Sequence, residues 1–524
     1  MKSKTKQCQN CKADFTIEPE DFEFYKKIDV PEPTFCPNCR AQRRLIWRNE
    51  NNLYKRKCDL TGKDIFSQFT PESKNKVYER DVWWSDQWNP MKYGKDYDFN
   101  KPFLEQFKEL LEEVPWPSRL VTDLVNSDYS MNASFLKNCY LIFDSSNGEN
   151  CAFGVALNNV KDSYDGYSLE KCELCYQGFN LTSCYKTFFS SHCTDCQEIY
   201  FCHNCIDCSN CFGCSNLRHK KYHIFNESYS KEEYFKKLKE FDLGSYKKIL
   251  SLNKETREFW LKHPVKFMHG RKNDNVTGEY IDNSKDVKNS YMVKGSENLK
   301  YCHLVWFNTQ DCYDYFCWGD NARLIYEGTV VGSGVSQLKF CFSAWECRNL
   351  EYCINSINSH DLFGCSGLQH KQYCILNKQY SKEEYFKMIG KIKKNMDDMP
   401  YIDKKERVYK YGEFFPSELS PLDYNSTIAN EYYPLAKEEA LKQGYSWYNK
   451  PKSEHQPTIK AIDLPDNIKD VDDKILKEVI ECSSPDCSGS NAFRIIPQEL
   501  EFYQKMNLPL PRLCPDCRYE ERIK

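Results

Sequence analysis

The sequence contains two regions in which like residues recur every twelve positions, and this period constrains the fold more strongly than any other feature. From residue 136 the chain can be written in lines of twelve that begin LKNCYLIFDSSN, GENCAFGVALNN and VKDSYDGYSLEK. All twelve cysteines between residues 139 and 214 then fall in columns 1, 4, 7 or 10. Column 5 holds Tyr140, Ala152, Tyr164, Tyr176, Phe188, Tyr200 and Phe212. A fixed short period with like residues in register is typical of a solenoid.

The line before, LVNSDYSMNASF (124–135), also fits this frame, and the frame returns 151 residues after it, from residue 275. The two copies close alike, since 18 of 25 residues are identical between segments 212–236 and 363–387. In the second copy, column 7 is expected to stack Cys317, Cys341, Cys353 and Cys365. The sequence therefore predicts a mainly β protein with helical connectors, built on a duplicated parallel β-solenoid.

The period leaves the size of one coil open between 12 and 24 residues. Each line pairs a strand-like stretch with a turn rich in Ser, Asn, Asp and Gly. A coil of only twelve residues is too narrow to hold a column of Tyr and Phe inside, so we expect two lines per coil and two facing sheets. An antiparallel meander is the alternative. Ser230 with Glu233, and Ser381 with Glu384, form capping-box patterns, which predict a helix over the open end of each solenoid.

Both ends of the chain carry four cysteines in two pairs. They are Cys8, Cys11, Cys36 and Cys39 at one end and Cys482, Cys487, Cys514 and Cys517 at the other. Segments 15–40 and 493–518 align without gaps, with 13 of 26 residues identical. Four thiolates from two tight turns can close a tetrahedral site, for which structural Zn²⁺ is commoner than iron. We expect two structural Zn²⁺ ions, with redox or packing cysteines as the alternative.

The pattern CxxC, F-x-I-x-P, EFY, P-x-P and CPxCR resembles the family called the probable zinc-ribbon domain. The order of ribbon, WWSDQWNP segment, Cys-rich repeats and YGEFFPSELSPLDYN segment is similar to an uncharacterised bacterial family of zinc-ribbon plus Cys-rich repeat proteins. This resemblance covers most of the chain and implies zinc binding.

The chain contains 29 cysteines, an odd number, and lacks an apolar signal segment, so we expect a cytoplasmic protein with reduced thiols. The repeat cysteines are expected to be packing residues. Metal binding is the alternative, because the run from Cys202 to Cys214 at every third position would by itself suggest a cluster. A second candidate metal site combines Cys211, Cys214, His219 and His223 with the aligned Cys365, His370 and Cys374. Cys58 has no obvious partner.

Six basic residues near the first ribbon interleave with aromatic residues and form a candidate nucleic-acid surface. They are Arg43, Arg44, Arg48, Lys55, Arg56 and Lys57. Such groups could contact phosphates and unpaired bases, although a solvated helix is the plainer interpretation. The whole chain has a formal charge of −3, and no apolar run approaches the length of a membrane span, so neither a global polyanion nor a membrane is expected as partner.

The sequence contains no GxSxG, HExxH, Walker or GxGxxG motif, and Asp165, Asp314 and Asp320 are isolated acids. We therefore expect a non-enzymatic, zinc-binding scaffold or adaptor with an unidentified protein partner. A nucleic-acid or ribosome-associated protein is the alternative, and a metalloenzyme at the solenoid cap is a weaker one. The expected division is an N-terminal ribbon (1–57), Trp-rich connector (58–123), solenoid (124–231), helical connector (232–274), second solenoid (275–382), helical cap and linker (383–481) and C-terminal ribbon (482–524).

Overall fold

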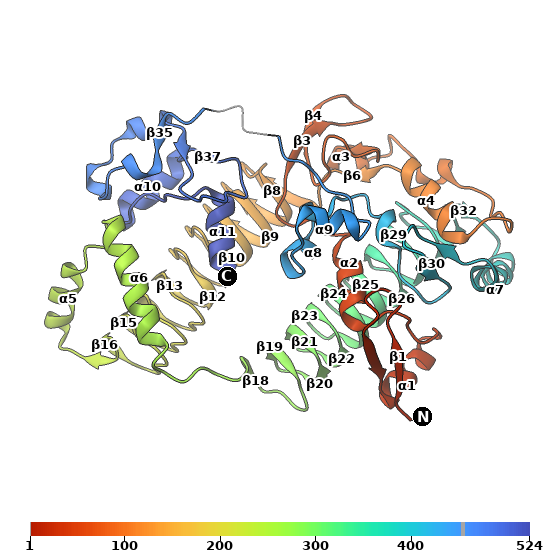
Figure 1. Cartoon of the computed structure of the whole chain (residues 1–524), viewed down its shortest axis with the longest axis horizontal. Helices are drawn as coiled ribbons and strands as arrows, with labels where there is room; N and C mark the ends of the chain where they lie inside the picture. Colours follow the sequence, from red (N-terminus) through yellow and green to blue (C-terminus); the bar gives the residue numbers. More distant parts are fainter. Residues whose placement is uncertain (1, 452–455, 524) are drawn as a thin grey trace. The chain divides into compact units, whose positions relative to one another are not determined.

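The computed structural model describes residues 2–451 and 456–523, and these form two compact units (Figure 1). Unit 1 comprises Met1–Arg119 and Lys266–Tyr448, and unit 2 comprises Leu120–Val265 and Asn449–Lys524. Each unit therefore combines one solenoid with the cysteine-rich segment from the other half of the chain. Nothing in the local sequence patterns predicted this exchange.

The first solenoid is parallel, and one coil contains twelve residues. Val155 pairs with Tyr167, and Tyr185 pairs with Gln197, each twelve positions further on. The expectation of two lines per coil was therefore wrong, as was the antiparallel alternative. The parallel strands are β7 (Val121–Val125), β8 (Ser130–Lys137), β9 (Tyr140–Glu149), β10 (Ala152–Lys161), β11 (Tyr167–Glu170), β12 (Phe179–Thr182), β13 (Tyr185–Phe188), β14 (Gln197–Tyr200), β15 (Ser209–Phe212) and β16 (Lys221–Ile224), and β17 (Glu227–Ser228) pairs antiparallel with β16.

Each coil is built from four triplets, and each triplet places one side chain inside. The residue before an inward one has a positive φ, as at Asn138 (φ 53°) before Cys139 and Asn150 (φ 54°) before Cys151. Asn, Asp and Gly adopt this left-handed conformation at the lowest cost, which explains their abundance at the turns. Columns 1, 4, 7 and 10 are the inward positions, so the aromatic residues of column 5 lie outside the coil. A coil of twelve residues is too narrow to enclose these rings, as expected. The rings are placed outside a narrow coil, and not inside a wider coil of two lines.

Inward side chains at neighbouring positions of the first solenoid differ in size, so that a small one leaves space for a larger one. A Cβ on Gly166 would lie 2.5 Å from Leu169 Cδ1, so the glycine makes room for the leucine. Elsewhere a thiol donates to the carbonyl two residues earlier, as Cys193 does to Ser191 O at 3.3 Å. Ser190 Oγ makes the same bond to Phe188 O at 2.9 Å. Cysteine and serine are therefore interchangeable in this role.

The second solenoid is also parallel but contains coils of thirteen residues. Gln310 pairs with Arg323 and Arg323 with Ser336, each thirteen positions on, whereas Ser336 pairs with Arg348 after twelve. The extra residue sits at a corner with two successive positive-φ residues, such as Asp320 and Asn321. The strands are β18 (Gly270–Arg271), β19 (Gly278–Asp282), β20 (Lys285–Lys288), β21 (Ser290–Lys294), β22 (Glu297–Lys300), β23 (His303–Trp306), β24 (Gln310–Gly319), β25 (Arg323–Gly332), β26 (Ser336–Lys339), β27 (Phe342–Trp345), β28 (Arg348–Glu351), β29 (Ile354–Ile357), β30 (His360–Phe363), β31 (Gln372–Ile375) and β32 (Lys378–Gln379).

These longer coils shift the predicted cysteine column. Cys341, Cys353 and Cys365 belong to the buried interior, but Cys317 lies at a positive-φ corner (φ 52°) and does not continue their stack. Tyr315 instead points inward in that coil and donates to Val331 O. A wider coil can thus enclose one aromatic ring.

Helices close the far end of each solenoid. Helix α5 (Lys231–Glu240) begins at Ser230 and α7 (Lys382–Asp398) begins at Ser381, and both have the predicted capping box. Tyr234 of α5 packs on Tyr222 with ring centroids 5.8 Å apart, and Tyr385 of α7 packs on Tyr373 at the same distance. The last strands are therefore covered, which protects their edges. The other helices of eight or more residues are α1 (Pro19–Lys27), α2 (Pro37–Leu45), α4 (Phe103–Glu113), α6 (Tyr246–Trp260), α10 (Pro497–Met506) and α11 (Pro515–Ile523).

Smaller elements complete the two units. Helices α3 (Arg80–Trp83), α8 (Ile428–Tyr432) and α9 (Lys437–Lys442) are short. The remaining strands are β1 (Lys4–Gln7), β2 (Asp14–Ile17), β3 (Tyr54–Lys57), β4 (Asp64–Ser67), β5 (Val77–Tyr78), β6 (Trp116–Pro117), β33 (Tyr401–Ile402), β34 (Val408–Tyr409), β35 (Ile459–Lys460), β36 (Ile480–Glu481) and β37 (Ala492–Phe493). No helix among the described residues is both long and apolar enough to cross a bilayer.

Candidate metal centres and their docking sites

The four N-terminal cysteines converge on one point. Cys8 and Cys11 lie in the turn between β1 and β2, Cys36 is the N-cap of α2, and Cys39 lies in its first turn. All four Sγ atoms lie within 4.8 Å of one another. We call residues 4–45, which contain this group, the N-terminal four-cysteine module.

The C-terminal cysteines form the same arrangement. Cys482 follows β36, and Cys514 and Cys517 lie at the start of α11. Their Sγ atoms and that of Cys487 also lie within 4.8 Å of one another. In both groups the backbone N–H of the third cysteine donates a hydrogen bond to the sulfur of the first. These bonds join Cys36 N to Cys8 Sγ and Cys514 N to Cys482 Sγ, both at 3.2 Å. We call residues 480–523 the C-terminal four-cysteine module.

Both groups fit a tetrahedral metal ion. With Zn–S bonds of about 2.3 Å, the sulfurs of a four-thiolate site lie about 3.8 Å apart. Cys11 Sγ and Cys36 Sγ are 3.7 Å apart, and Cys487 Sγ is 3.5 Å from Cys514 Sγ. Bonds with Cys36 and Cys39 lower the pKa of Cys8, and the same group of contacts raises the pKa of Cys36 and of Cys39, so these three sulfurs are electrostatically coupled. Four protein ligands leave no open position for a substrate, as is typical of structural sites.

The N-terminal module is joined to the second solenoid through a buried salt bridge. Arg40, next to Cys39, contacts Asp314 Oδ2 through Nη2 at 2.8 Å, and Arg44 Nη1 lies 3.3 Å from Asp314 Oδ1. All three side chains are at most 3 % exposed. Beside them, the ring of Phe24 stacks on Tyr313 with centroids 3.9 Å apart. We call this set of two arginines, one aspartate and two rings the docking clamp.

The C-terminal module repeats the docking clamp on the first solenoid, residue for residue. Arg518 Nη1 lies 2.8 Å from Asp165 Oδ2, and Arg522 Nη1 lies 2.7 Å from Asp165 Oδ1. Phe502 stacks on Tyr164 with centroids 4.2 Å apart. The arginines follow the last module cysteine at the first and fifth positions in both copies, and a Tyr-Asp pair receives them in both solenoids.

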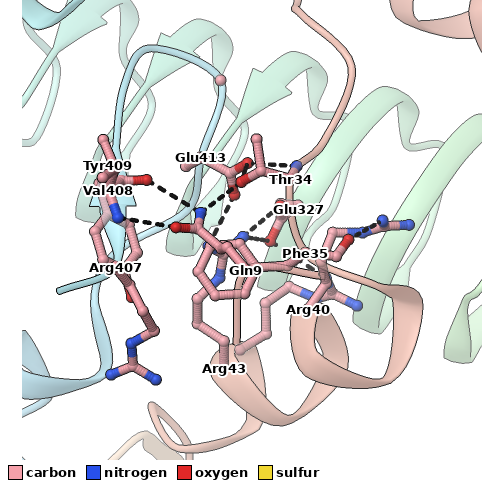
Figure 2. A network of polar contacts seen from close by, with 12 residues as sticks. Gln9, Thr34, Phe35, Arg40, Arg43, Glu327, Arg407, Val408, Tyr409 and Glu413 are labelled. Atoms are coloured by element: carbon pink, nitrogen blue, oxygen red, sulfur yellow. Dashed lines mark hydrogen bonds and ion pairs between the residues drawn. The ribbon is translucent and has the colours of Figure 1, made fainter. Parts of the chain in front are cut away.

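Unit 1 adds a second layer of charge around Arg43, which has no counterpart among the described residues of unit 2; there the additional carboxylate, Glu499, contacts Arg518 itself at 3.1 Å. Figure 2 shows Arg43 between two carboxylates: its Nη2 lies 2.7 Å from Glu327 Oε1 and its Nη1 lies 2.9 Å from Glu413 Oε2. Burial raises the pKa of Glu327, and the arginines oppose this shift. In unit 2 the corresponding positions are Glu521 and Gln177, so this layer cannot form there.

The residues around this second layer of charge also contact the N-terminal cysteine group. Gln9, between the first two cysteines, accepts from Val408 N at 2.8 Å and donates to Val408 O at 3.1 Å (Figure 2). Thr34 Oγ1 donates to Glu413 at 2.6 Å. The segment around residues 407–413 thus holds the cysteine turn against the solenoid.

Three of the six residues in the candidate nucleic-acid surface are buried. Arg43, Arg44 and Arg48 are at most 5 % exposed and pair with Glu327, Asp314 and Glu50 within the protein. Their role in contacting phosphates is therefore corrected: they are docking and packing residues. The other three lie on β3, where Lys57 and Arg56 pair with Asp64 and Asp59, and Lys55 lies over the Phe66 ring.

The candidate metal site at the solenoid caps is not assembled. Cys211 and Cys214 are fully buried inside the coil, while His219 is exposed beside Asp207 and His223 Nδ1 lies 2.7 Å from Lys221 O. The second copy is similar, because Cys365 and Cys374 are interior and His370 is exposed. Among the described residues, sets of three or more ligands close enough for one ion occur at the two terminal cysteine groups alone.

Sequence reasoning treated Asp165 and Asp314 as isolated acids and missed their role. The available signal was the repeated CRxxxR spacing after each CPxC and the Tyr-Asp pair in each solenoid. Asp320 is different, because it lies at a corner and accepts from Ser333 Oγ at 3.2 Å.

Comparisons with known proteins add little to this site. No protein-family model matches the chain, and no curated protein matches it. Among solved structures, a putative acetyltransferase from Desulfovibrio desulfuricans G20 is 11 % identical and covers 55 % of this chain and 86 % of its own, with a TM-score of 0.11. This similarity carries no argument about fold or function.

Proposed function

We propose that this protein is a zinc-dependent, non-enzymatic scaffold, in which each four-cysteine module fastens one solenoid to the opposite end of the chain. The observation that carries the proposal is the docking clamp. Cys39 and Arg40 are adjacent, as are Cys517 and Arg518, so a metal ion that orders the cysteine turn also places the buried arginine. A closed four-thiolate site with this neighbour suits a structural role.

The solenoids supply the rigid part of the proposed scaffold. Their interiors are filled by side chains, and each coil is hydrogen-bonded to the next along its length. Aromatic side chains remain on the outer face, including Phe135 and Phe307, each 55 % exposed. Such rings suit contact with a partner protein, because aromatic residues supply much of the binding energy in interfaces.

Metal stoichiometry tests the proposal. We expect about two zinc ions per purified chain, one per four-cysteine group, and about one after either Cys39→Ser or Cys517→Ser. Cys193→Ser, inside the first solenoid, is the matched control and should leave the metal content unchanged. Iron, four or more zinc ions, or a loss of metal in the control would contradict it.

Binding to single-stranded RNA provides a second test. Because Arg43, Arg44 and Arg48 are buried, the scaffold proposal predicts no salt-dependent affinity in fluorescence polarisation. Affinity that falls steeply with salt and is lost on Lys55→Ala with Lys57→Ala would favour the nucleic-acid alternative.

A further inference from the structure

Residues 54–84, which contain the unassigned Cys58, repeat the backbone of the N-terminal four-cysteine module. Strands β3 and β4 pair antiparallel with Tyr54 opposite Ser67 and Lys57 opposite Asp64. Strands β1 and β2 pair with Lys4 opposite Ile17 and Gln7 opposite Asp14. The two hairpins therefore have the same length and register, fifty residues apart.

The turns that join these strands also match. In the N-terminal module, Cys8 N donates to Ala13 O at 2.9 Å and Lys12 N donates to Cys8 O at 3.0 Å. In the later hairpin, Cys58 N donates to Lys63 O and Gly62 N to Cys58 O, both at 2.8 Å. The left-handed residue also occupies the same place, with φ 63° at Lys12 and 72° at Gly62.

The strongest correspondence lies outside the hairpin. Glu79 N donates to Cys58 Sγ at 3.3 Å, just as Cys36 N donates to Cys8 Sγ at 3.2 Å. A helix begins directly after each donor, α3 after Glu79 and α2 after Cys36. The C-terminal module has the same bond, from Cys514 N to Cys482 Sγ. A backbone N–H bond to the first sulfur thus marks the third ligand position in all three segments.

We infer that residues 54–84 are a third module of the four-cysteine type, in which three of the four cysteines are missing. Its ligand positions are Cys58, Thr61, Glu79 and Val82, by correspondence with Cys8, Cys11, Cys36 and Cys39. Segment 68–78 is shorter than its counterpart and contains no helix.

Apolar packing replaces the metal in this third module. Cys58 belongs to a buried cluster with Tyr78, Val82, Trp83 and Ile357. Trp83 also donates to Pro115 O at 3.0 Å. Because burial of apolar side chains stabilises a fold, several of them together can hold a small hairpin and helix without an ion. This assignment accounts for the one cysteine that belongs neither to a four-cysteine group nor to a solenoid.

Restoring the missing ligands tests the inference. The full chain with Thr61→Cys, Glu79→Cys and Val82→Cys should bind about three zinc ions instead of two. Loading with Co²⁺ should raise the absorption bands of tetrahedral thiolate cobalt by about half relative to the unaltered protein. The control carries the same changes with Cys58→Ser and should show a weaker third site. A folded triple variant with two ions and unchanged cobalt bands would overturn the inference.

A single substitution tests the same inference in case the triple variant does not fold. Thr61 lies on the exposed turn, so Thr61→Cys alone should preserve the fold and place its thiol beside Cys58. Phenylarsine oxide, which binds two neighbouring thiols, should then capture one additional equivalent on the zinc-loaded protein. Leu60→Cys, one residue earlier and also exposed, is the matched control and should capture no additional phenylarsine oxide. Equal capture by the two variants, or by neither, would contradict the shared turn geometry.

Discussion

At the scale of single residues, the narrow coil determines which side chains the solenoids use. Four inward positions per twelve residues leave room for Cys, Ser, Gly, Val, Ile and Leu, and a thiol or hydroxyl can donate to a carbonyl of its own coil. Burial raises the pKa of Cys302 and of Cys347 to about 12, whereas contacts with neighbouring cysteines lower the pKa of Cys208 and of Cys214. No third set of ligand atoms close enough for one metal ion is found among the described residues. The large cysteine content of the chain is therefore mostly a packing feature.

Substitution of alanine for a glycine inside a coil should lower the free energy of unfolding. Gly166→Ala places a Cβ 2.5 Å from Leu169 Cδ1 in a closely packed coil, so we expect a loss of about 1–3 kcal/mol in the free energy of unfolding. The measurement is the shift in thermal midpoint, relative to the unaltered protein, of the unit that carries each substitution: unit 2 for Gly166 and unit 1 for Gly390. Gly390→Ala is the control: that position lies in helix α7 with no atom within 4 Å of the new Cβ, and alanine favours helix there. Equal shifts for the two variants would refute the packing argument.

A single histidine should make the stability of unit 1 depend on pH. Burial lowers the pKa of His303 to about 4, and its ring lies against Phe316 and Tyr432. Below a pH of about 6.5 the unfolded chain binds a proton that the folded chain refuses, so stability falls as the pH drops from there to about 4. The full loss is at most about 3 kcal/mol.

The comparison of the unaltered protein with His303→Phe isolates this effect from acid release of zinc, which both proteins share. The unaltered protein should lose stability relative to the variant as the pH falls from about 7 to about 5, because the variant lacks the titrating group. The measurement is the difference between their thermal midpoints across this range. Parallel profiles would show that His303 contributes nothing.

At the scale of elements, the same docking clamp is built twice from a module helix and a solenoid strand. Asp165→Asn should remove the charge partner that the buried Arg518 and Arg522 share, while Arg518 keeps Glu499 Oε1 at 3.1 Å, so we expect a cost of about 3 kcal/mol. Asp195→Asn, at an exposed corner of the same solenoid with a positive φ that asparagine tolerates, is the matched control.

The readout is limited proteolysis of the C-terminal four-cysteine module together with the thermal midpoint. We expect earlier cleavage within residues 480–523 for Asp165→Asn than for the control. If both variants behave like the unaltered chain, the clamp does not hold the module to the solenoid.

At the scale of the whole molecule, metal should control how the modules dock but not whether the solenoids form. The solenoid cores consist of strand ladders and packed side chains, whereas each four-cysteine module is small and, under the proposed function, depends on an ion for its fold. Removal of zinc by a chelator should release both modules and uncover the rings they stack on, Tyr164 and Tyr313.

We therefore expect chelation to increase the binding of a hydrophobic dye, while the far-ultraviolet signal of β-structure changes little. Re-addition of zinc should reverse the dye signal. A complete loss of β-structure on removal of the zinc would show that the solenoids also require metal.

The sequence by itself determined the features that depend on local spacing. The twelve-residue period placed the inward columns, the paired cysteines defined both four-cysteine groups, and Ser230 and Ser381 marked the starts of the closing helices, because all of these involve residues a few positions apart or an exact repeat. The period could not say whether one or two lines make a coil, since both choices give the same columns.

Only the tertiary structure decided what the charged residues do. Arg40 and its partner Asp314 are 274 positions apart, and each solenoid receives its module from the other half of the chain. In sequence an arginine beside a cysteine turn is equally compatible with a phosphate contact and with a buried carboxylate. The choice depends on whether water can reach the guanidinium, and that is set by packing between segments with no local relation to one another.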